Sequence, residues 1–374
     1  MDIRGAVAVA GVLMMSACTE LPESPPAVTP VTLPTVSQAE VFPGADWLRA
    51  PRRGFADLDR TLESTGSTCV AVVRDGELVH EAYWGGGSPE AKRATYSITK
   101  SLTAILVGIA ADDGDLALDD AVADHVPSWR GTASRDVTIR DVLANTSGRH
   151  TDDATDDRLI SQSADASAFA VDLGQDAAPG DTWEYNNSAI QVLETVLEKA
   201  TGQEVVDFAT KRLLEPLDMR HTTWARDRAG NATTYSGVYS SCPDLARVGL
   251  LMMRGGDWDG RRIVSQELVA EATGRPSSRL NAAYGLLWWV NGEGRVVEVL
   301  RQAGYSQDKP SYDGRIAPGV PADAFWAYGY GDEYVAVVPS EGVVAVRLGG
   351  RPETPDQLSF DVFTGGVLDA LDPG

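Results

Sequence analysis

The sequence is poor in lysine and histidine. Its 374 residues carry 32 basic side chains, only five of them lysines, against 54 acidic ones, so the formal net charge is -22. The four histidines are scattered without the spacing of a metal-binding motif, so we expect no metal ion and no cofactor. A chain this acidic, with no basic stripe to neutralise phosphates, excludes nucleic acid as a partner.

Cysteine is also scarce, with Cys18, Cys69 and Cys242 as the three examples. Cys69 lies in a strand-like segment and Cys242 at an expected helix start, and neither has a histidine near it in the sequence. We expect Cys69 and Cys242 to be two separate buried thiols. Outside the cytoplasm the alternative is a disulfide between them, which needs a geometry that the sequence does not reveal.

The sequence has no apolar run long enough to span a membrane. Arg4 precedes the apolar residues 5–15, which are too few to span a bilayer, and the segment ends in Ser16-Ala17-Cys18. This pattern is typical of a bacterial export signal with a lipobox. We therefore expect residues 1–18 to be a signal peptide, with Cys18 lipidated and the protein anchored in the cell envelope only through that lipid. The alternative is an ordinary cleaved signal and a secreted protein.

The remaining chain divides into a linker and one large domain. Residues 19–45 are rich in proline and cannot form a packed core, so they predict a spacer. Residues 46–374 are enough for a large core. Strand patterns and amphipathic helices occur near both ends of this domain, around a mostly helical region at about 112–275. The expected strands cover 68–74, 77–84, 286–290, 334–338 and 343–348, and the expected terminal helices cover 55–64 and 355–371. This order predicts an α+β fold, an antiparallel sheet flanked by terminal helices with a helical insertion.

The clearest chemical signal is Ser97-Ile98-Thr99-Lys100, which opens the apolar run 101–110. The run predicts a buried helix, in which residues i and i+3 share a face, so the Lys100 amine can reach the Ser97 hydroxyl. Burial lowers the pKa of a lysine, which can then take the proton that makes a serine nucleophilic. A chance match in a surface helix is the alternative, and the scarcity of lysine and the apolar setting argue against it.

A second motif lies within residues 179–187, a turn-rich stretch that leads into a predicted helix at 188–201. Tyr185 and Asn187 alternate along an extended segment, so both side chains can point the same way. The alternative role for these residues is structural: Tyr185 would pack against the sheet, and Asn186 or Asn187 would cap the helix that follows.

The combination of Ser97-x-x-Lys100 with Tyr185-x-Asn187 resembles the serine beta-lactamase and penicillin-binding superfamily, in its class C and esterase branch. Residues 138–148, 198–203, 243–249 and 284–289 are similar to stretches typical of these proteins, and the resemblance covers about residues 50–371. It implies a beta-lactamase/transpeptidase-like fold and acylation of Ser97 by a small ester or amide. It also implies proton transfer through Lys100 and Tyr185, and a hydrogen bond from Asn187 to the substrate or to Lys100.

The third motif of that superfamily is altered. Lys-Thr-Gly or His-x-Gly is expected beside the nucleophile, and the best candidate here is Ala327-Tyr328-Gly329, followed by Tyr330. Because the basic residue that meets a substrate carboxylate is missing, beta-lactamase and D-alanyl-D-alanine carboxypeptidase activities are less expected. The pattern is more similar to esterases and to aminohexanoate-oligomer (nylon oligomer) hydrolases. Gly329 would allow close approach to substrate, and the Tyr330 and Ser97 N–H groups would form the oxyanion hole.

An acidic segment, His150 to Asp157, follows the stretch that ends at Gly148. In this superfamily such a loop borders the mouth of the site, so we hypothesise that its carboxylates favour neutral or cationic substrates. The four carboxylates are those of Asp152, Asp153, Asp156 and Asp157. A solvated surface loop without this role is the alternative.

Two other functions fit less well. An alpha/beta hydrolase would need Gly-x-Ser-x-Gly, and the nearest string, residues 304–308, does not end in glycine. A non-catalytic or slowly acylated penicillin-binding-type surface lipoprotein stays open, because the altered third motif could abolish turnover while the pocket persists. We expect an exported serine hydrolase, a carboxylesterase or an amidase.

Overall fold

A computed structural model describes residues 41–298, 311–350 and 358–372. The expected signal peptide, the lipidation site at Cys18 and most of the proline-rich linker lie outside these ranges, so their assignments stay predictions. Within the described ranges, none of the helices combines the length and the apolarity that crossing a membrane requires.

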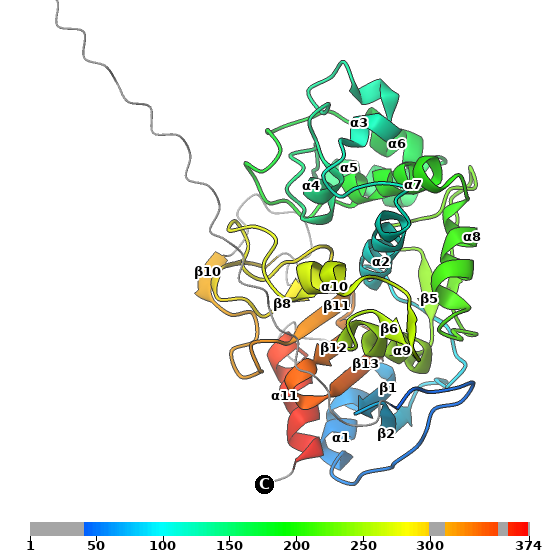
Figure 1. The fold of residues 1–374 in the computed structure, drawn as a ribbon. Helices are drawn as coiled ribbons and strands as arrows, with labels where there is room; N and C mark the ends of the chain where they lie inside the picture. The colour runs from blue at the N-terminus through cyan, green and yellow to red at the C-terminus, as the bar shows by residue number, and fades with distance from the viewer. Residues whose placement is uncertain (1–40, 299–310, 351–357, 373–374) are drawn as a thin grey trace, which may run out of the picture. The chain divides into compact units, whose positions relative to one another are not determined.

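The centre of the fold is an antiparallel sheet of six strands in the order β2-β1-β13-β12-β11-β8 (Figure 1). In chain order, the strands are β1 (Ser67–Arg74), β2 (Glu77–Tyr83), β8 (Trp289–Val290), β11 (Phe325–Gly329), β12 (Glu333–Val338) and β13 (Val343–Gly349). Valine dominates the central strands, and both faces of β12 and β13 are buried. Branched side chains on both faces of a strand indicate a sheet covered on both sides.

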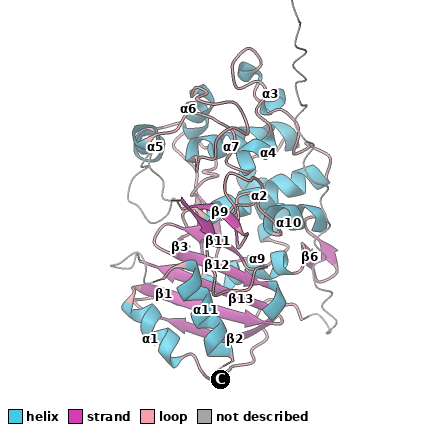
Figure 2. Ribbon diagram, turned by 90° about the vertical axis from the view of Figure 1, so that its left-hand side faces the viewer, coloured by secondary structure: helices cyan, strands magenta, loops and turns pink. Residues whose placement is uncertain are grey.

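Helices from both ends of the domain cover one face of this sheet. α1 (Ala56–Ser64) packs against α11 (Phe360–Leu371) and β1, and Figure 2 shows α1 and α11 side by side in front of the strands. On the other face, α9 (Cys242–Met253) packs against β1, β12 and β13, while α2 (Ile98–Asp112) packs against β11 and β12. α2 lies between the sheet and the helical region, so residues from both can contact its first turn.

Short helices and loops between α2 and α9 form the helical region. They are α3 (Val122–His125), η1 (Pro127–Trp129), α4 (Ile139–Leu143), α5 (Asp153–Asp157), η2 (Arg158–Gln162), α6 (Ala166–Asp172), α7 (Asn187–Thr201), α8 (Val205–Ala209) and η3 (Thr210–Leu214). α7 is the central element of this region, because it packs against α2, α3, α4, α5, α6 and α8. Gly202 ends α7 in the left-handed conformation at φ 67°, as its place after the apolar pattern predicts. The α+β fold expected from the sequence is confirmed.

Smaller elements complete the domain. They are the sheet of β3 (Arg93–Ala94), β5 (Val238–Ser240) and β4 (Thr223–Trp224), the hairpins β6 (Asp257–Trp258) with β7 (Arg261–Arg262) and β9 (Gly294–Val297) with β10 (Ser311–Gly314), the helix α10 (Gln266–Thr273) and the turn η4 (Pro339–Glu341). Gly342 closes the η4 turn at φ 61°, where a Cβ would lie 2.3 Å from Asp75 Oδ1. Glycine is therefore required to join β12 to β13.

Two boundaries differ from the sequence prediction. The strand expected at 286–290 is reduced to Trp289–Val290, because Leu287 takes φ 57°, which a strand cannot accommodate. The final helix begins at Phe360 rather than near 355, with the Ser359 side chain accepting the capping bond from Val362 N. α9, which lies inside the range expected for the helical insertion, packs on the central sheet.

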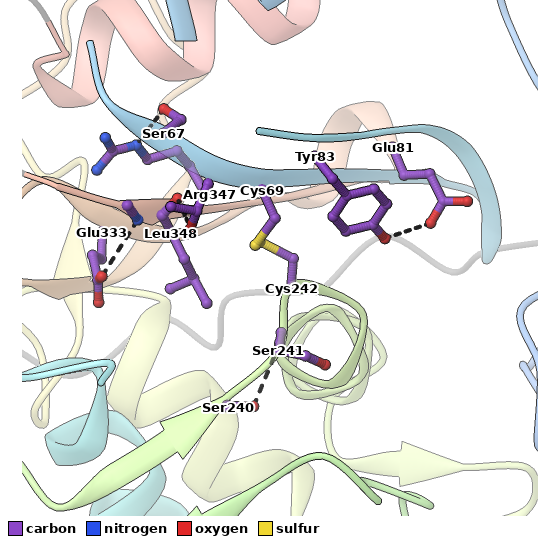
Figure 3. Close-up of a disulfide and its surroundings, with 12 residues drawn as sticks. Ser67, Cys69, Glu81, Tyr83, Ser240, Ser241, Cys242, Glu333, Arg347 and Leu348 are labelled. Atoms are coloured by element: carbon purple, nitrogen blue, oxygen red, sulfur yellow. Dashed lines mark hydrogen bonds between the residues drawn. A yellow bond between two sulfur atoms is a disulfide. The ribbon is translucent and has the colours of Figure 1, made fainter. Parts of the chain in front are cut away.

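The two internal cysteines form a disulfide, so the expectation of separate thiols was wrong. Cys69 of β1 and Cys242 at the start of α9 are joined with a Cα–Cα distance of 6.2 Å, across 173 residues of sequence (Figure 3). Both side chains are buried. α9 packs against β1 and brings the two residues within bridging distance, which the sequence alone could not show. The bridge ties the central sheet to the helix on its second face.

Candidate active site

Ser97 stands at the N-cap of α2, where its hydroxyl does not cap the helix. A serine in this position ordinarily accepts a hydrogen bond from an N–H of the first turn. Here Ser97 Oγ lies 2.8 Å from Lys100 Nζ instead. The contact between Ser97 and Lys100 that the sequence predicts is therefore present within one helical turn. The Ser97 hydroxyl is directed to the lysine rather than to the helix backbone.

Lys100 is held in the interior, with 1% of its surface exposed. Its Nζ also donates to the carbonyl oxygen of Tyr235 at 2.9 Å and lies 4.8 Å from the centroid of the Tyr185 ring. Desolvation lowers the pKa of Lys100 from 10.5 to about 7, and the carboxylate of Asp156 opposes this shift. A substantial neutral fraction at neutral pH makes Lys100 a base that can accept the Ser97 proton.

Tyr185 contacts the same hydroxyl from the loop before α7. Burial raises the pKa of Tyr185 above its ordinary value of 10.0, while a side-chain hydrogen bond with Ser97 opposes the rise. Aromatic neighbours fix the ring: Trp289 stacks on it with centroids 6.4 Å apart, and Tyr284 meets it edge-on at 6.3 Å. A phenol in these surroundings is neutral at physiological pH and is a proton donor.

Asn187 is the first residue of α7, and its Nδ2 donates to Asp156 Oδ1 at 2.7 Å. The helix cap is made by its neighbour Asn186, whose side chain accepts from Ala189 N at 2.8 Å. Of the two structural alternatives from the sequence, capping therefore belongs to Asn186. This leaves the Asn187 amide directed to the carboxylate that acts on Lys100.

The acidic segment folds differently from a solvated loop. Asp152 caps α5 by accepting from Thr155 N at 2.7 Å, and Asp153 and Asp157 are exposed on that helix. Asp156 instead is buried against Asn187. The four carboxylates thus separate into three at the surface and one inside the site, and their effect on substrate charge stays a prediction.

The end of β11 lies against the residues that precede the nucleophile. A Cβ at Gly329 would lie 2.4 Å from the Thr95 carbonyl oxygen, so this close approach requires glycine. The next residue, Tyr330, places its ring 5.6 Å from that of Tyr96, which immediately precedes Ser97. The altered third motif is therefore beside the nucleophile, as the resemblance implies.

A buried arginine holds the turn that carries Tyr330. Arg347 of β13 donates from Nη1 to the carbonyl oxygens of Gly331 at 2.6 Å and Asp332 at 3.0 Å. Its Nε donates to Ser67 Oγ at 2.8 Å, and the whole side chain is inaccessible to solvent. These bonds anchor the β11–β12 turn, which carries Tyr330, to β13.

Three contacts in the site were not predicted from the sequence. Tyr235 contributes its carbonyl to Lys100, Asp156 contributes the buried carboxylate, and Tyr96 packs on Tyr330. Tyr235 and Tyr96 match no motif, and Asp156 was predicted only as one of four carboxylates at the site entrance, not as a buried partner of Asn187. Within the described ranges, no group of three or more histidine, cysteine or carboxylate side chains could hold a metal ion.

The sequence and the fold are both similar to those of known proteins. The chain is 28% identical over 267 residues to the 6-aminohexanoate-dimer hydrolase of Paenarthrobacter ureafaciens, covering 64% of this chain and 68% of that protein. It is 27% identical over 319 residues to penicillin-binding protein 4 of Amycolatopsis lactamdurans, covering 78% and 82% respectively. The structure of a penicillin-binding protein homologue from Caulobacter crescentus superposes with a TM-score of 0.60 at 17% identity, covering 87% of this chain and 100% of that one. This last likeness concerns the fold alone. The Beta-lactamase family profile matches residues 56–359, and the protein therefore belongs to the Beta-lactamase family, whose fold serves serine hydrolases.

Proposed function

We propose that the protein is a serine hydrolase that cleaves an ester or amide through an acyl-enzyme on Ser97. The observation that carries this proposal is the 2.8 Å contact between Ser97 Oγ and the Nζ of a lysine that is 1% exposed. Burying an amine in an apolar helix is costly, and the hydroxyl beside it gains a base. The Ser97–Lys100 pair is present even though the third motif lacks its basic residue.

The pKa shifts suggest which group moves which proton. Lys100, with a pKa of about 7, accepts the Ser97 proton as Oγ attacks the acyl carbon. Tyr185, with its pKa raised by burial, donates its phenol proton to the leaving oxygen or nitrogen. The Lys100 ammonium, 4.8 Å from the Tyr185 ring centroid, then returns a proton to the phenolate. The same groups activate water in deacylation, with each transfer reversed.

Backbone N–H groups of Ser97 and Tyr330 would stabilise the tetrahedral oxyanion. Ser97 lies at the start of α2, where the helix dipole favours negative charge. The close packing of Gly329 on Thr95 supports Tyr330 as the second donor. Asn187, held by Asp156, would orient the substrate amide or ester.

Esters and linear amides are the substrates we favour. The candidate third motif, Ala327-Tyr328-Gly329, lacks the lysine or histidine that would meet a substrate carboxylate. A relative covering most of the domain is named for hydrolysis of the 6-aminohexanoate dimer, a linear amide. Because that dimer itself ends in a carboxylate, the missing basic residue favours a neutral linear amide, which should be tested beside the dimer and a simple ester.

We also propose that the protein acts outside the cytoplasm, anchored through a lipid on Cys18. The sequence at 1–18 supports export, and the Cys69–Cys242 disulfide suits an oxidising compartment. Expression in a bacterial host with a radiolabelled fatty acid tests this. Label should appear in the wild type and be lost in Cys18→Ala; label in neither would count against the anchor.

The central test is intact-protein mass spectrometry after exposure to a fluorophosphonate, with Ser97→Ala as the control. We expect one adduct on the wild type and none on Ser97→Ala. Turnover of p-nitrophenyl acetate, the 6-aminohexanoate dimer and a penicillin is then compared for both proteins. No adduct on well-folded wild type would refute the hydrolase and favour a non-catalytic binding protein on this fold. Adduct formation with a stable penicilloyl species would favour a slowly acylated penicillin-binding protein.

A further inference from the structure

Exposed large apolar side chains gather next to the nucleophile. Within the described residues such side chains are few, and three of them are Tyr96, Tyr239 and Tyr330, exposed by 41%, 44% and 58%. The others are Leu48, Ile160, Tyr312 and Val362. Tyr96 immediately precedes Ser97, so this tyrosine cluster, defined as Tyr96, Tyr239 and Tyr330, lies at the outer side of the site.

The three rings come from different elements that meet at the start of α2. Tyr96 and Tyr330 contact edge-to-face, with centroids 5.6 Å apart and an interplanar angle of 71°. Tyr239 belongs to β5, which pairs with β3 so that Tyr239 is opposite Ala94, and Thr95 N donates to Val238 O at 2.9 Å. Electrostatic interaction with Tyr239 and Tyr330 contributes to the raised pKa of Tyr96, after burial and the carboxyl of Glu333. Tyr96 and Tyr330 are therefore in direct contact, and the pairing of β3 with β5 brings Tyr239 to the same end of α2.

The backbone at Tyr96 supports a functional origin for this patch. Its φ is 44°, in the left-handed region that a bulky residue seldom occupies. Such strain persists only where surrounding bonds impose it, and it is concentrated at functional sites. Here Thr95 is hydrogen-bonded to the Val238 carbonyl oxygen through both its N–H and its hydroxyl, its own carbonyl packs closely against Gly329, and α2 begins two residues after Tyr96. The strained residue is both the neighbour of Ser97 and the central ring of the cluster.

We propose that Tyr96, Tyr239 and Tyr330 form an aromatic subsite that favours esters or amides carrying a planar aryl group. This inference rests on the proposed hydrolase function and narrows its substrate class. Tyrosine faces and edges attract another aromatic ring in offset-stacked or edge-to-face geometry, which a saturated ring of the same size cannot match. A ring bound there sits beside the Ser97 hydroxyl, so it belongs to the acyl or the leaving group of a reacting substrate.

Two matched pairs of esters test the subsite from either side of the scissile bond. Methyl phenylacetate against methyl cyclohexylacetate places the ring on the acyl group, and benzyl acetate against cyclohexylmethyl acetate places it on the leaving group. We expect the aryl member to have a kcat/KM about three- to ten-fold higher in at least one pair, which is the preference that one aromatic contact provides. Tyr239→Leu and Tyr330→Leu, which keep the backbone N–H, should reduce that ratio towards one. Tyr239→Phe and Tyr330→Phe should restore it.

Tyr312→Leu is the matched control, since Tyr312 is 40% exposed on β10 and is not part of the cluster. Its aryl-to-cyclohexyl ratio should equal that of the wild type. Equal kcat/KM within both pairs, with ester turnover abolished in Ser97→Ala, would overturn the aromatic subsite and leave the hydrolase intact. A ratio unchanged in both leucine variants would overturn it as well. No fluorophosphonate adduct and no ester turnover by the wild type would instead refute the hydrolase, and the subsite with it.

Discussion

The lowered pKa of Lys100 predicts an unusual dependence of activity on pH. If neutral Lys100 is the base, kcat/KM for an uncharged ester follows its neutral fraction. With a pKa of about 7, that fraction rises about ten-fold between pH 6 and pH 8 and then levels. At the ordinary pKa of 10.5, it would rise about 100-fold over the same interval and continue to climb. The two outcomes differ in both steepness and shape.

Asp156 provides the perturbation that tests the cause. Its carboxylate raises the pKa of Lys100, so Asp156→Asn should move the ascending limb to lower pH. Other groups that face Lys100 are neutral: the Ser97 hydroxyl, the Tyr185 phenol and the Tyr235 ring and carbonyl. Asp157→Asn is the control, because Asp157 is exposed on the same helix and should leave the midpoint unchanged.

The assay is kcat/KM for a neutral ester with a poor leaving group, measured from pH 5 to pH 10 in buffers of constant ionic strength. Circular dichroism at each pH verifies that the variants stay folded. An ascending limb centred above pH 9 in the wild type would refute the role of desolvation. A midpoint that moves upward in Asp156→Asn, or equally in Asp157→Asn, would refute the electrostatic assignment.

Three further changes have definite outcomes. Lys100→Met should abolish turnover yet raise the free energy of unfolding at pH 7 by about 1–3 kcal/mol, because removing a desolvation penalty of about 4 kcal/mol outweighs the lost hydrogen bonds to Ser97 and Tyr235. Since the pKa of Lys100 is lower in the folded state than in the unfolded state, this penalty grows as the pH falls from 10.5 to about 7. Urea unfolding at pH 7 and pH 10 measures the difference, and a variant less stable than the wild type at pH 7 would contradict it. The double variant Cys69→Ala/Cys242→Ala should lose about 2–5 kcal/mol, read from urea unfolding, and equal stability of the wild type with and without reductant would contradict this. Gly329→Ala should lower kcat/KM for an ester and also lower the free energy of unfolding by about 1–3 kcal/mol, because the added Cβ would lie 2.4 Å from the Thr95 carbonyl oxygen. Unchanged ester kinetics would argue against the close approach.

Local sequence was enough for the parts of the site that lie within one element. Ser97 and Lys100 are three residues apart in α2, and helical geometry alone brings their side chains together. The strands β1, β12 and β13 and the turns that follow β1 and β12 were predicted from short valine-rich runs bounded by glycine-containing turns, and these predictions were confirmed. The family resemblance, carried by Ser97-x-x-Lys100 and Tyr185-x-Asn187, predicted Tyr185 as the third member of the site, and the structure places its side chain in hydrogen-bond contact with Ser97.

Contacts between distant segments were decided by tertiary packing. Cys69 and Cys242 pair because α9 lies on β1, and no pattern in either segment encodes that packing. Asp156 is one of four similar aspartates in a short stretch, and only the docking of α5 on α7 selects it for burial.

The sequence by itself determined the Ser97–Lys100 pair and the class of fold, because periodicity and i, i+3 spacing act over a few residues. The tertiary structure decided what surrounds that pair. It brought the Tyr235 carbonyl and the Asp156 carboxylate to Lys100 and assembled three tyrosines from separate elements beside Ser97. The pKa of a buried group and the shape of a subsite depend on all the atoms around them, and those atoms come from parts of the chain that only folding brings together.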